Sequence, residues 1–272
     1  MTVKKVRLDV LVVERGLVET REQAKRSIMA GLVFSGSNRM DKPGVKVKED
    51  IPLEIKGKEI PYVGRGGLKL EKALKYFDLE IQDRIMMDIG ASTGGFTDCA
   101  LQNGVSLCYA IDVGYNQLAW KLRNDDRVIV MERTNFRHAT PELFTHGEPN
   151  FATIDVSFIS LKLIFPPLKD ILSEGSDVVA LIKPQFEAGK DKVEKRGIVR
   201  NAKVHEEVLR DTIAAASENQ LSLVDLTYSP ITGGDGNIEF LAHFKFTPNI
   251  SLDTIDYSSL IEKVVKDAHQ TL

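Results

Sequence analysis

The chain has 272 residues, 43% of them hydrophobic and 28% charged, with a formal net charge of −3, a composition typical of a globular protein with one large and one small domain. No apolar run approaches the roughly 18 residues needed to cross a bilayer. The two cysteines, Cys99 and Cys108, have no zinc-type spacing with histidine, so we expect neither a membrane span nor a metal site. The N-terminus has no signal-peptide pattern, so we expect a cytoplasmic protein.

The charge is unevenly distributed along the chain. Residues 1–76 contain 17 Lys and Arg against 10 Asp and Glu, whereas the remainder contains 19 against 29. A basic N-terminal part on an acidic body suggests a polyanionic partner at that end, although a solvated lysine face would give the same count.

Residues 1–58 are expected to form a small α+β domain. A first helix should end near Gly16, and the capping-box sequence Thr20–Gln23 should start a second helix that stops at Gly31. Short strands should follow at 32–34, 45–47 and 50–55, the first two around the turn at Gly36.

Three segments of this domain match a known RNA-binding module: Arg7–Asp9, Arg21–Lys25 and Ile28–Val33. The chain here resembles the RNA-binding domain named after ribosomal protein S4, which lies on folded ribosomal or transfer RNA. Its basic side chains would form a patch suited to phosphate groups rather than to base edges. The resemblance implies RNA contacts at Arg7, Arg21, Lys25 and Arg26.

Residues 59–67 have the glycine and proline content of a linker. Arg65, which lies between glycines, is either a hinge residue or an RNA contact. Residues 68–272 are expected to form the second domain, and the spacing of apolar residues predicts that a helix over 68–77 opens it. Lys69 lies in the first turn of that helix, where the helix dipole disfavours a cation, and this position suggests a function.

From Arg84 onward, expected strands alternate with expected helices. The strands are 85–89, 106–112, 128–132, 151–156, 177–183, 221–228 and 238–246. The helices are 95–103, 116–123, 140–145, 160–172, 201–219 and 256–269. This alternation predicts a Rossmann-like α/β sheet covered on both faces, with ligands at the carboxyl ends of its strands. Polar residues fall at or just beyond these ends: Asp88, Asp112, Asn135, Asp155 and Lys183.

The segment Met86–Thr97 is predicted to run from a strand through a glycine-rich turn into a helix. Glycines in the turn would let a ligand lie against bare backbone N–H groups at the positive end of the helix. Asp112, about twenty residues later, could offer its carboxylate to a ribose diol. The spacing D-x-G-x-x-x-G-G, which begins at Asp88, resembles the first motif of the S-adenosylmethionine (SAM) methyltransferases. An ordinary strand-to-helix turn is the simpler alternative.

Charged residues at strand ends suggest a second part of the site. Lys183 follows the apolar run 178–182, where a lysine is costly to bury unless it is paired or functional. Glu239 begins the apolar final strand, and it should meet Lys183 if that strand runs antiparallel to the one ending at Lys183. Lys183, Glu239, Asp155 and Lys69 could alternatively form structural ion pairs at a domain seam, without a role in catalysis.

The residues Lys69, Asp155, Lys183 and Glu239 match, in order and in local context, the lysine–aspartate–lysine–glutamate tetrad of the FtsJ-like ribose 2′-O-methyltransferases. With the S4-like domain in front, the whole chain resembles the TlyA family of ribosomal RNA methyltransferases, some members of which are catalogued as haemolysins. The resemblance implies methyl transfer from SAM to a ribose 2′-hydroxyl of ribosomal RNA, at a cytidine. It implies that Lys183 contacts the hydroxyl, that Asp155 and Glu239 orient it and that Lys69 helps to hold the substrate.

The resemblance also implies SAM contacts along the glycine turn, at the ribose and near the adenine. The residues concerned are Asp88, Gly90, Ser92, Thr93, Gly94, Gly95, Phe96, Asp112, Asn135 and Phe136. Asn135 replaces an aspartate found there in some relatives.

A basic loop after Lys183 contains Lys190, Lys192 and Arg196. Its position beside the expected site favours a lid that grips RNA, whereas its composition alone fits solvated surface. Three other functions remain open: a different RNA enzyme such as a pseudouridine synthase, a membrane-lytic haemolysin, and an RNA-binding protein without methyl-transfer activity.

Overall fold

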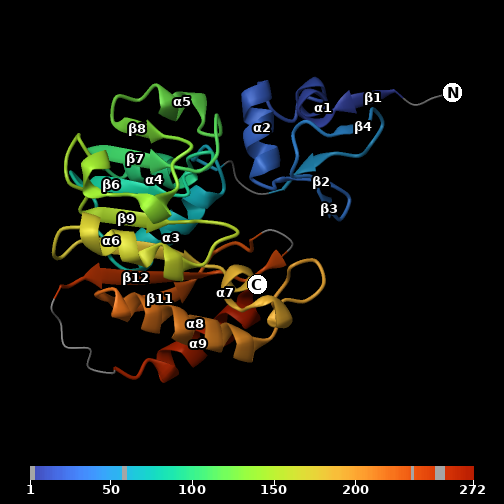
Figure 1. Cartoon of the computed structure of the whole chain (residues 1–272). Coiled ribbons are helices and arrows are strands. Elements are labelled where there is room, and N and C mark those ends of the chain that lie inside the picture. Colours follow the sequence, from blue (N-terminus) through green and yellow to red (C-terminus); the bar gives the residue numbers. More distant parts are fainter. Residues whose placement is uncertain (1–3, 57–59, 234–235, 249–254) are drawn as a thin grey trace. The chain divides into compact units, whose positions relative to one another are not determined.

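The computed structural model describes residues 4–56, 60–233, 236–248 and 255–272 (Figure 1). The chain divides into two compact units, Met1–Gly67 and Leu68–Leu272. Within these described ranges, the first unit contains two small sheets and the second contains one sheet of seven strands.

Two helices, α1 (Leu8–Glu14) and α2 (Arg21–Met29), form the centre of the first unit. The predicted capping box is confirmed, because the Thr20 hydroxyl accepts a hydrogen bond from the Gln23 N–H and the Gln23 side chain accepts one from the Thr20 N–H. The inner sides of both helices contribute to one hydrophobic cluster, which contains Leu8, Leu11, Val12, Ala24, Ile28, Val33 and Val47.

The strand pairing of the first unit differs from the expectation. Strand β2 (Val33–Ser35) pairs with β3 (Asn38–Arg39) and with β5 (Glu54–Ile55). The segment expected to form a strand beside β2 at 45–47 is instead β4 (Lys46–Lys48), which pairs with the unpredicted strand β1 (Lys5–Arg7). The reason is the two-residue turn after β2, since a turn of that length makes the chain pair at once with the residues that follow it.

The sheet of the second unit has the strand order β11-β12-β10-β9-β6-β7-β8. Its strands are β6 (Ile85–Ile89), β7 (Leu107–Ile111), β8 (Val128–Met131), β9 (Phe151–Ile154), β10 (Asp177–Ile182), β11 (Leu221–Tyr228) and β12 (Phe240–Phe246). Strands β6 to β10 are parallel, and β12 runs antiparallel to both β10 and β11. The seven predicted strands and the antiparallel last strand are therefore confirmed, and the carboxyl ends of β6 to β10 share one edge of the sheet.

The helices of this part of the chain are α3 (Gly66–Tyr76), α4 (Gly95–Gln102), α5 (Trp120–Arg123), α6 (Phe165–Ile171), α7 (Pro184–Glu187), α8 (Ala202–Glu218) and α9 (Ser258–Thr271). The helix expected over 116–123 is reduced to α5, and Asn116 just before it has a left-handed φ of 57°. The helix expected over 160–172 divides into the 3-10 helix η3 (Leu161–Leu163) and α6, because two prolines occupy the first turn of α6. The segment expected as a helix over 140–145 forms only the 3-10 helix η2 (Pro141–Leu143). None of the described helices is long and apolar enough to cross a membrane.

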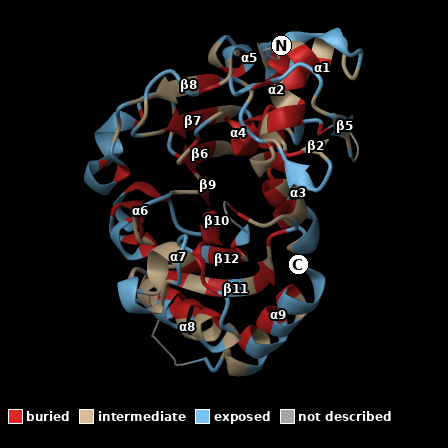
Figure 2. Cartoon of the chain, turned by 90° about the vertical axis from the view of Figure 1, so that its right-hand side faces the viewer, coloured by how far each residue is buried: buried red, intermediate tan, exposed pale blue. Residues whose placement is uncertain are grey.

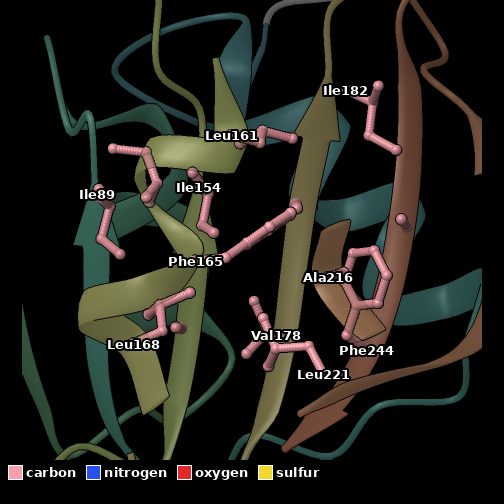
Figure 3. Packing of buried hydrophobic residues seen from close by; sticks show 14 of the residues in the cluster. Ile89, Ile154, Leu161, Phe165, Leu168, Val178, Ile182, Ala216, Leu221 and Phe244 are labelled. Atoms are coloured by element: carbon pink, nitrogen blue, oxygen red, sulfur yellow. The ribbon is translucent and has the colours of Figure 1, made fainter. Parts of the chain in front are cut away.

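Helices cover both faces of the large sheet, so that its strands are buried while the outer sides of the helices are exposed (Figure 2). On one face, Val178 and Phe244 pack with Phe165 of α6 and Ala216 of α8 (Figure 3). On the other face, His243 of β12 packs against Phe77, which follows α3, with ring centroids 5.5 Å apart. The helices cover the faces of the sheet but not the edge formed by the carboxyl ends of the parallel strands. Side chains that directly follow these strands lie at that edge.

Candidate active site

Four charged side chains meet at the carboxyl edge of the sheet. The Lys69 amine, from the first turns of α3, lies 2.7 Å from Glu239 Oε2 and 3.7 Å from Asp155 Oδ2. Lys183, directly after β10, lies 2.5 Å from Asp155 Oδ1. The predicted convergence of these four residues in space is therefore present, with alternating charges in the order Glu239, Lys69, Asp155, Lys183.

One predicted contact within this group is wrong, because Glu239 pairs with Lys69 rather than with Lys183. The register of β10 and β12 places Ile182 opposite Phe240, so Lys183 and Glu239 do lie at the same level of the sheet. Helix α3, however, brings the Lys69 amine to Glu239, while Asp155 at the end of the neighbouring strand takes Lys183. The amine of Lys183 also donates a hydrogen bond to the exposed Ser157 hydroxyl at 3.1 Å.

The four side chains form a neutral, largely buried group. Lys69, Lys183 and Glu239 are 6%, 8% and 2% exposed, and buried charges of this kind are tolerated only when they are paired. Burial alone would raise the pKa of Asp155, but the ammonium groups of Lys69 and Lys183 outweigh it and lower that pKa. Asp155 therefore remains a carboxylate that holds both lysines.

The glycine turn lies directly against this group. Gly90, which follows β6, has a φ of +87°, and a Cβ atom there would lie 2.5 Å from the carbonyl oxygen of Asp155. Only glycine meets both demands, the left-handed backbone and the close approach. The turn between β6 and α4 is thus joined to the strand end that carries Asp155.

Asp88 lies beneath the turn rather than at its surface. It is completely buried, and its carboxylate accepts hydrogen bonds from the Thr97 N–H, the Thr97 hydroxyl and the Thr153 hydroxyl at 2.7–3.0 Å. Burial raises the pKa of Asp88 to about 6, against these hydrogen bonds, which lower it. The side chain fixes the first turn of α4 to strands β6 and β9.

Asp112, after β7, joins the glycine turn to the next loop. Its carboxylate accepts hydrogen bonds from the Ser92 N–H at 2.8 Å and from the Gly114 N–H at 2.7 Å. Each carboxylate oxygen retains a free lone pair, because an ionised carboxylate accepts about four hydrogen bonds. Ser92 is exposed and Thr93 and Asp112 are half-buried, so this part of the site is open to a ligand.

Comparison with protein-family models assigns both units of the chain. Residues 62–246 match the FtsJ-like methyltransferase model, and residues 6–50 match the S4 domain model. The chain belongs to the FtsJ-like methyltransferase family. The antiparallel last strand and the four converging charged residues are thus features of a member of this family.

Individual relatives cover nearly the whole chain. YqxC of Bacillus subtilis, which carries a provisional name as an rRNA methyltransferase, is 61% identical over 272 residues, 100% of this chain and 97% of that protein. The 16S/23S rRNA (cytidine-2′-O)-methyltransferase TlyA of Mycobacterium tuberculosis is 36% identical and covers 97% of this chain and 98% of its own. A solved structure from Streptococcus thermophilus, provisionally named a hemolysin, has a TM-score of 0.79, 55% identity, and coverage of 99% and 98%.

The cofactor of this FtsJ-like methyltransferase is SAM, and the residues at the edge of the sheet fit it. The left-handed turn at Gly90 leaves no side chain between the end of β6 and the backbone of Asp155. The half-buried Asp112 carboxylate beside the turn has the chemistry that a ribose diol requires.

The two residues expected near the adenine differ in exposure. Asn135 is exposed, and its side-chain oxygen accepts a hydrogen bond from the Arg137 N–H at the start of the 3-10 helix η1 (Phe136–His138). Phe136 is buried in the hydrophobic cluster of the sheet. Three of the expected contact residues in the glycine turn are also buried: Gly94, which is the N-cap of α4, and Gly95 and Phe96 in its first turn.

An aromatic pair beside the tetrad was missed in the sequence. Phe158 is 92% exposed and has a left-handed φ of 63°, and its ring centroid lies 5.1 Å from that of Phe186. Phe158 follows Asp155 by three residues, and Phe186 follows Lys183 by three. That shared spacing after two neighbouring strand ends is the signal that could have revealed the pair.

In the first unit, three of the predicted basic residues, Arg7, Arg21 and Lys25, are paired with acidic residues. Arg7 and Arg21 both donate to the buried Asp9 carboxylate, at 3.0 and 2.9 Å, and remain about half exposed. The hydrogen bond from the Arg7 guanidinium lowers the pKa of Asp9, burial raises it, and Arg21 lowers it further. The resulting pKa of Asp9 is about 2. Lys25 pairs with Glu22, and Arg26 and Arg65 are half-buried.

The basic loop after α7 is anchored rather than extended. Lys190 and Lys192 lie in the 3-10 helix η4 (Lys190–Lys192), and the Lys192 amine pairs with Glu207 of α8. Arg196 is exposed, with a left-handed φ of 70°. Two of the three predicted basic side chains of this loop, Lys190 and Arg196, are therefore exposed to solvent.

Proposed function

We propose that this chain transfers a methyl group from SAM to a ribose 2′-hydroxyl of ribosomal RNA, at a cytidine. The observation that carries the proposal is the contact between the glycine turn and Asp155, because the side chain of Asp155 in turn pairs with the Lys183 amine. The M. tuberculosis relative is named for cytidine 2′-O-methylation of 16S and 23S rRNA, which supports this substrate. The protein would accordingly act in the cytoplasm, where ribosomal RNA is found.

The SAM-binding residues in this proposal are those of the turn and of the loops after β7 and β8. Gly90, Ser92, Thr93, Gly94, Gly95 and Phe96 form the turn, Asp112 would bind the ribose, and Asn135 and Phe136 would lie toward the adenine. Asp88 would act from beneath by holding the turn, since it is buried. Bound there, the sulfonium supplies an electrophilic methyl group.

The residues of the chain then have mainly a positioning task. Lys183 would contact the target hydroxyl, with Asp155 holding its amine, while Lys69 links Asp155 to Glu239. Such alignment of two reacting groups can contribute roughly 7–11 kcal/mol to lowering a barrier. The hydrogen bond from Lys183 to Ser157 leads from the buried tetrad to the surface, which is the side from which RNA would approach.

The aromatic pair, in which Phe158 is exposed and Phe186 half-buried, fits an unpaired target nucleotide. Proteins that read RNA by sequence bind mostly unstacked bases on aromatic side chains, and Phe158 offers an exposed ring three residues from Asp155. Further RNA contacts in this proposal are Arg7, Arg21, Lys25, Arg26, Arg65, Lys190, Lys192 and Arg196.

A methyl-transfer assay tests the proposal. The purified full chain is incubated with labelled SAM and ribosomal subunits from cells that lack it, and 2′-O-methyl groups on the RNA are mapped. Wild type should label a cytidine, whereas Lys183→Ala should abolish labelling and keep SAM affinity within about twofold, because Lys183 is not among the proposed cofactor contacts. Full turnover by Lys183→Ala, or leakage of dye-filled vesicles without any RNA methylation by wild type, would contradict it.

A further inference from the structure

The outer side of α3 borders a groove that belongs to no part of the site described above. It has a volume of about 520 Å³ and is lined by Leu68, Glu71, Lys72, Lys75, Tyr76, Pro230 and Ile231. This volume lies within the range of roughly 300–1,000 Å³ that is common for ligand sites. Two residues at the end of α3, Lys75 and Tyr76, are exposed.

The groove begins next to the tetrad. Lys69 and Lys72 are three residues apart on α3, so their Cβ atoms are separated by about 5–6 Å. On the opposite wall, Pro230 and Ile231 belong to the connection between β11 and β12, and the Ser229 N–H at its start donates to the carbonyl oxygen of Glu239. The same two segments, α3 and the connection that leads from β11 to β12, therefore carry residues of both the tetrad and the groove.

Lys72 is the charged group that gives the groove its chemistry. Its amine lies 3.5 Å from the centroid of the Tyr228 ring, and no carboxylate of the described residues pairs with it. Burial lowers the pKa of Lys72, as expected for an ammonium group without an acidic partner. Glu71, the acidic residue of the lining, instead lies 3.3 Å from the Lys75 amine, so the groove has an excess of positive charge.

Aromatic and apolar surface completes the lining. Tyr76 is 47% exposed, and its ring is held edge-on to that of Phe77, with centroids 5.5 Å apart. Proteins that bind single-stranded nucleic acid combine cationic groups for the backbone with aromatic rings on which bases stack. The groove has both, on the segments that also carry Lys69 and Glu239.

We propose that this groove binds the RNA strand next to the target nucleotide, with Lys72 and Lys75 at its phosphate groups and Tyr76 beneath a base. The inference rests on the proposed methyl transfer to RNA and adds the path of the strand away from the tetrad. A single strand is required, because a base must be unstacked from its neighbours to lie on Tyr76.

Binding and kinetics of the full chain test this path. The probe is a fluorescent single-stranded RNA of nine nucleotides with a central cytidine, titrated at several salt concentrations. Lys72→Ala, Lys75→Ala and Tyr76→Ala are compared with Lys169→Ala, which removes an exposed lysine from α6. Each groove lysine removed should weaken binding about tenfold and reduce the salt slope by about 0.7. Lys72→Arg, which keeps the charge, should retain most of the affinity.

Methyl transfer to ribosomal subunits provides the second measurement. The groove variants should raise the KM for RNA about tenfold while kcat and SAM affinity stay within about twofold of wild type. If wild type methylates RNA and the groove variants match Lys169→Ala in affinity, salt slope and KM, the path is wrong. If wild type binds the oligonucleotide but transfers no methyl group, the proposed function fails instead. Lys75 is 75% exposed, so its variant remains informative even if Lys72→Ala is poorly folded.

Discussion

The Gly90 backbone and the carbonyl group of Asp155 are in direct contact, with no room for a Cβ atom between them. The contact joins the end of β6 to the end of β9, which are neighbouring strands of the sheet. A displacement of the glycine turn would therefore also displace Asp155 and, through it, both lysines of the tetrad.

Replacing Gly90 by alanine should impair both SAM binding and stability. The new Cβ atom would lie 2.5 Å from the Asp155 carbonyl oxygen, at a residue with a φ of +87°. We expect a loss of roughly 1–3 kcal/mol in the free energy of unfolding and at least a tenfold weaker SAM affinity, measured by denaturant titration and calorimetry.

Gly175→Ala is the matched control for this substitution. Gly175 also has a left-handed φ, of 81°, but a Cβ atom there would have nothing within 4 Å. It should show the backbone strain alone and leave SAM binding unchanged. Equal effects of the two substitutions on SAM affinity would refute the contact argument.

The pair of Lys69 and Glu239 should be coupled in stability. Removing Lys69 leaves Glu239 as a buried charge without the amine that pairs with it, which costs about 3–5 kcal/mol. Removing the charge of Glu239 takes away the shorter of the two ion pairs of Lys69 and leaves the one with Asp155. We therefore expect Lys69→Met and Glu239→Gln each to destabilise the fold, and the double variant to lose less than the sum of the two. A double-mutant cycle in urea measures this coupling, and strictly additive losses would count against it.

Methyl transfer should follow a different pattern in the same three variants. The double variant regains part of its stability but lacks the amine that links Asp155 to Glu239. Its activity should remain as low as that of Lys69→Met, at least a hundredfold below wild type. An active double variant would mean that the tetrad is needed only for folding.

The sequence predicted the strands and the charged residues of the site well, but not all of the contacts. Asp155, Lys183 and Glu239 lie at strand ends, and strand ends follow from hydrophobic runs in the sequence. Which amine reaches which carboxylate depends on how α3 packs on the sheet, and that packing is long-range. The pairing of Glu239 with Lys69 was therefore not predictable from the spacing of the residues along the chain.

The sequence also did not show which residues near the site are buried and which are exposed. Asp88 and Phe136 lie close in sequence to more exposed positions of the turn and the loop, and alternation along a strand or a short helix decides which way each points. The exposure of Phe158 depends on a left-handed backbone at a residue other than glycine, which local sequence rarely predicts.

Asp88 should make the stability of the fold depend on pH. Its pKa rises from 3.8 to about 6 in the folded chain, so the folded state holds the proton more tightly than the unfolded state. The resulting contribution to stability is fully present below about pH 4 and is lost as the pH rises through 6. A shift of about two pKa units corresponds to about 3 kcal/mol.

Asp88→Asn removes this titration while keeping the size of the side chain. As the pH rises from about 4 to 6.5, wild type should therefore lose stability relative to this variant, so that its free energy of unfolding falls while that of the variant does not show this loss. Denaturant titrations at several pH values measure it, with Asp126→Asn, at an exposed residue, as the control. A difference that is constant across this range would show that Asp88 does not titrate there.

Phe158 should matter for RNA and not for folding. A phenylalanine that is 92% exposed contributes little to the core, and stacking of one base on an aromatic ring is worth about 1–3 kcal/mol. Phe158→Ala should thus leave the melting temperature and the SAM affinity unchanged and reduce kcat/KM for RNA about tenfold or more. Val224→Ala, at another exposed apolar residue, on β11, is the control.

An aromatic side chain should be required at position 158. Phe158→Trp keeps an aromatic face that can pack against the Phe186 ring and stack on a base, so it should retain activity. Phe158→Leu has no such face and should be as impaired as Phe158→Ala. Restoration by leucine would indicate that the site needs bulk rather than an aromatic face.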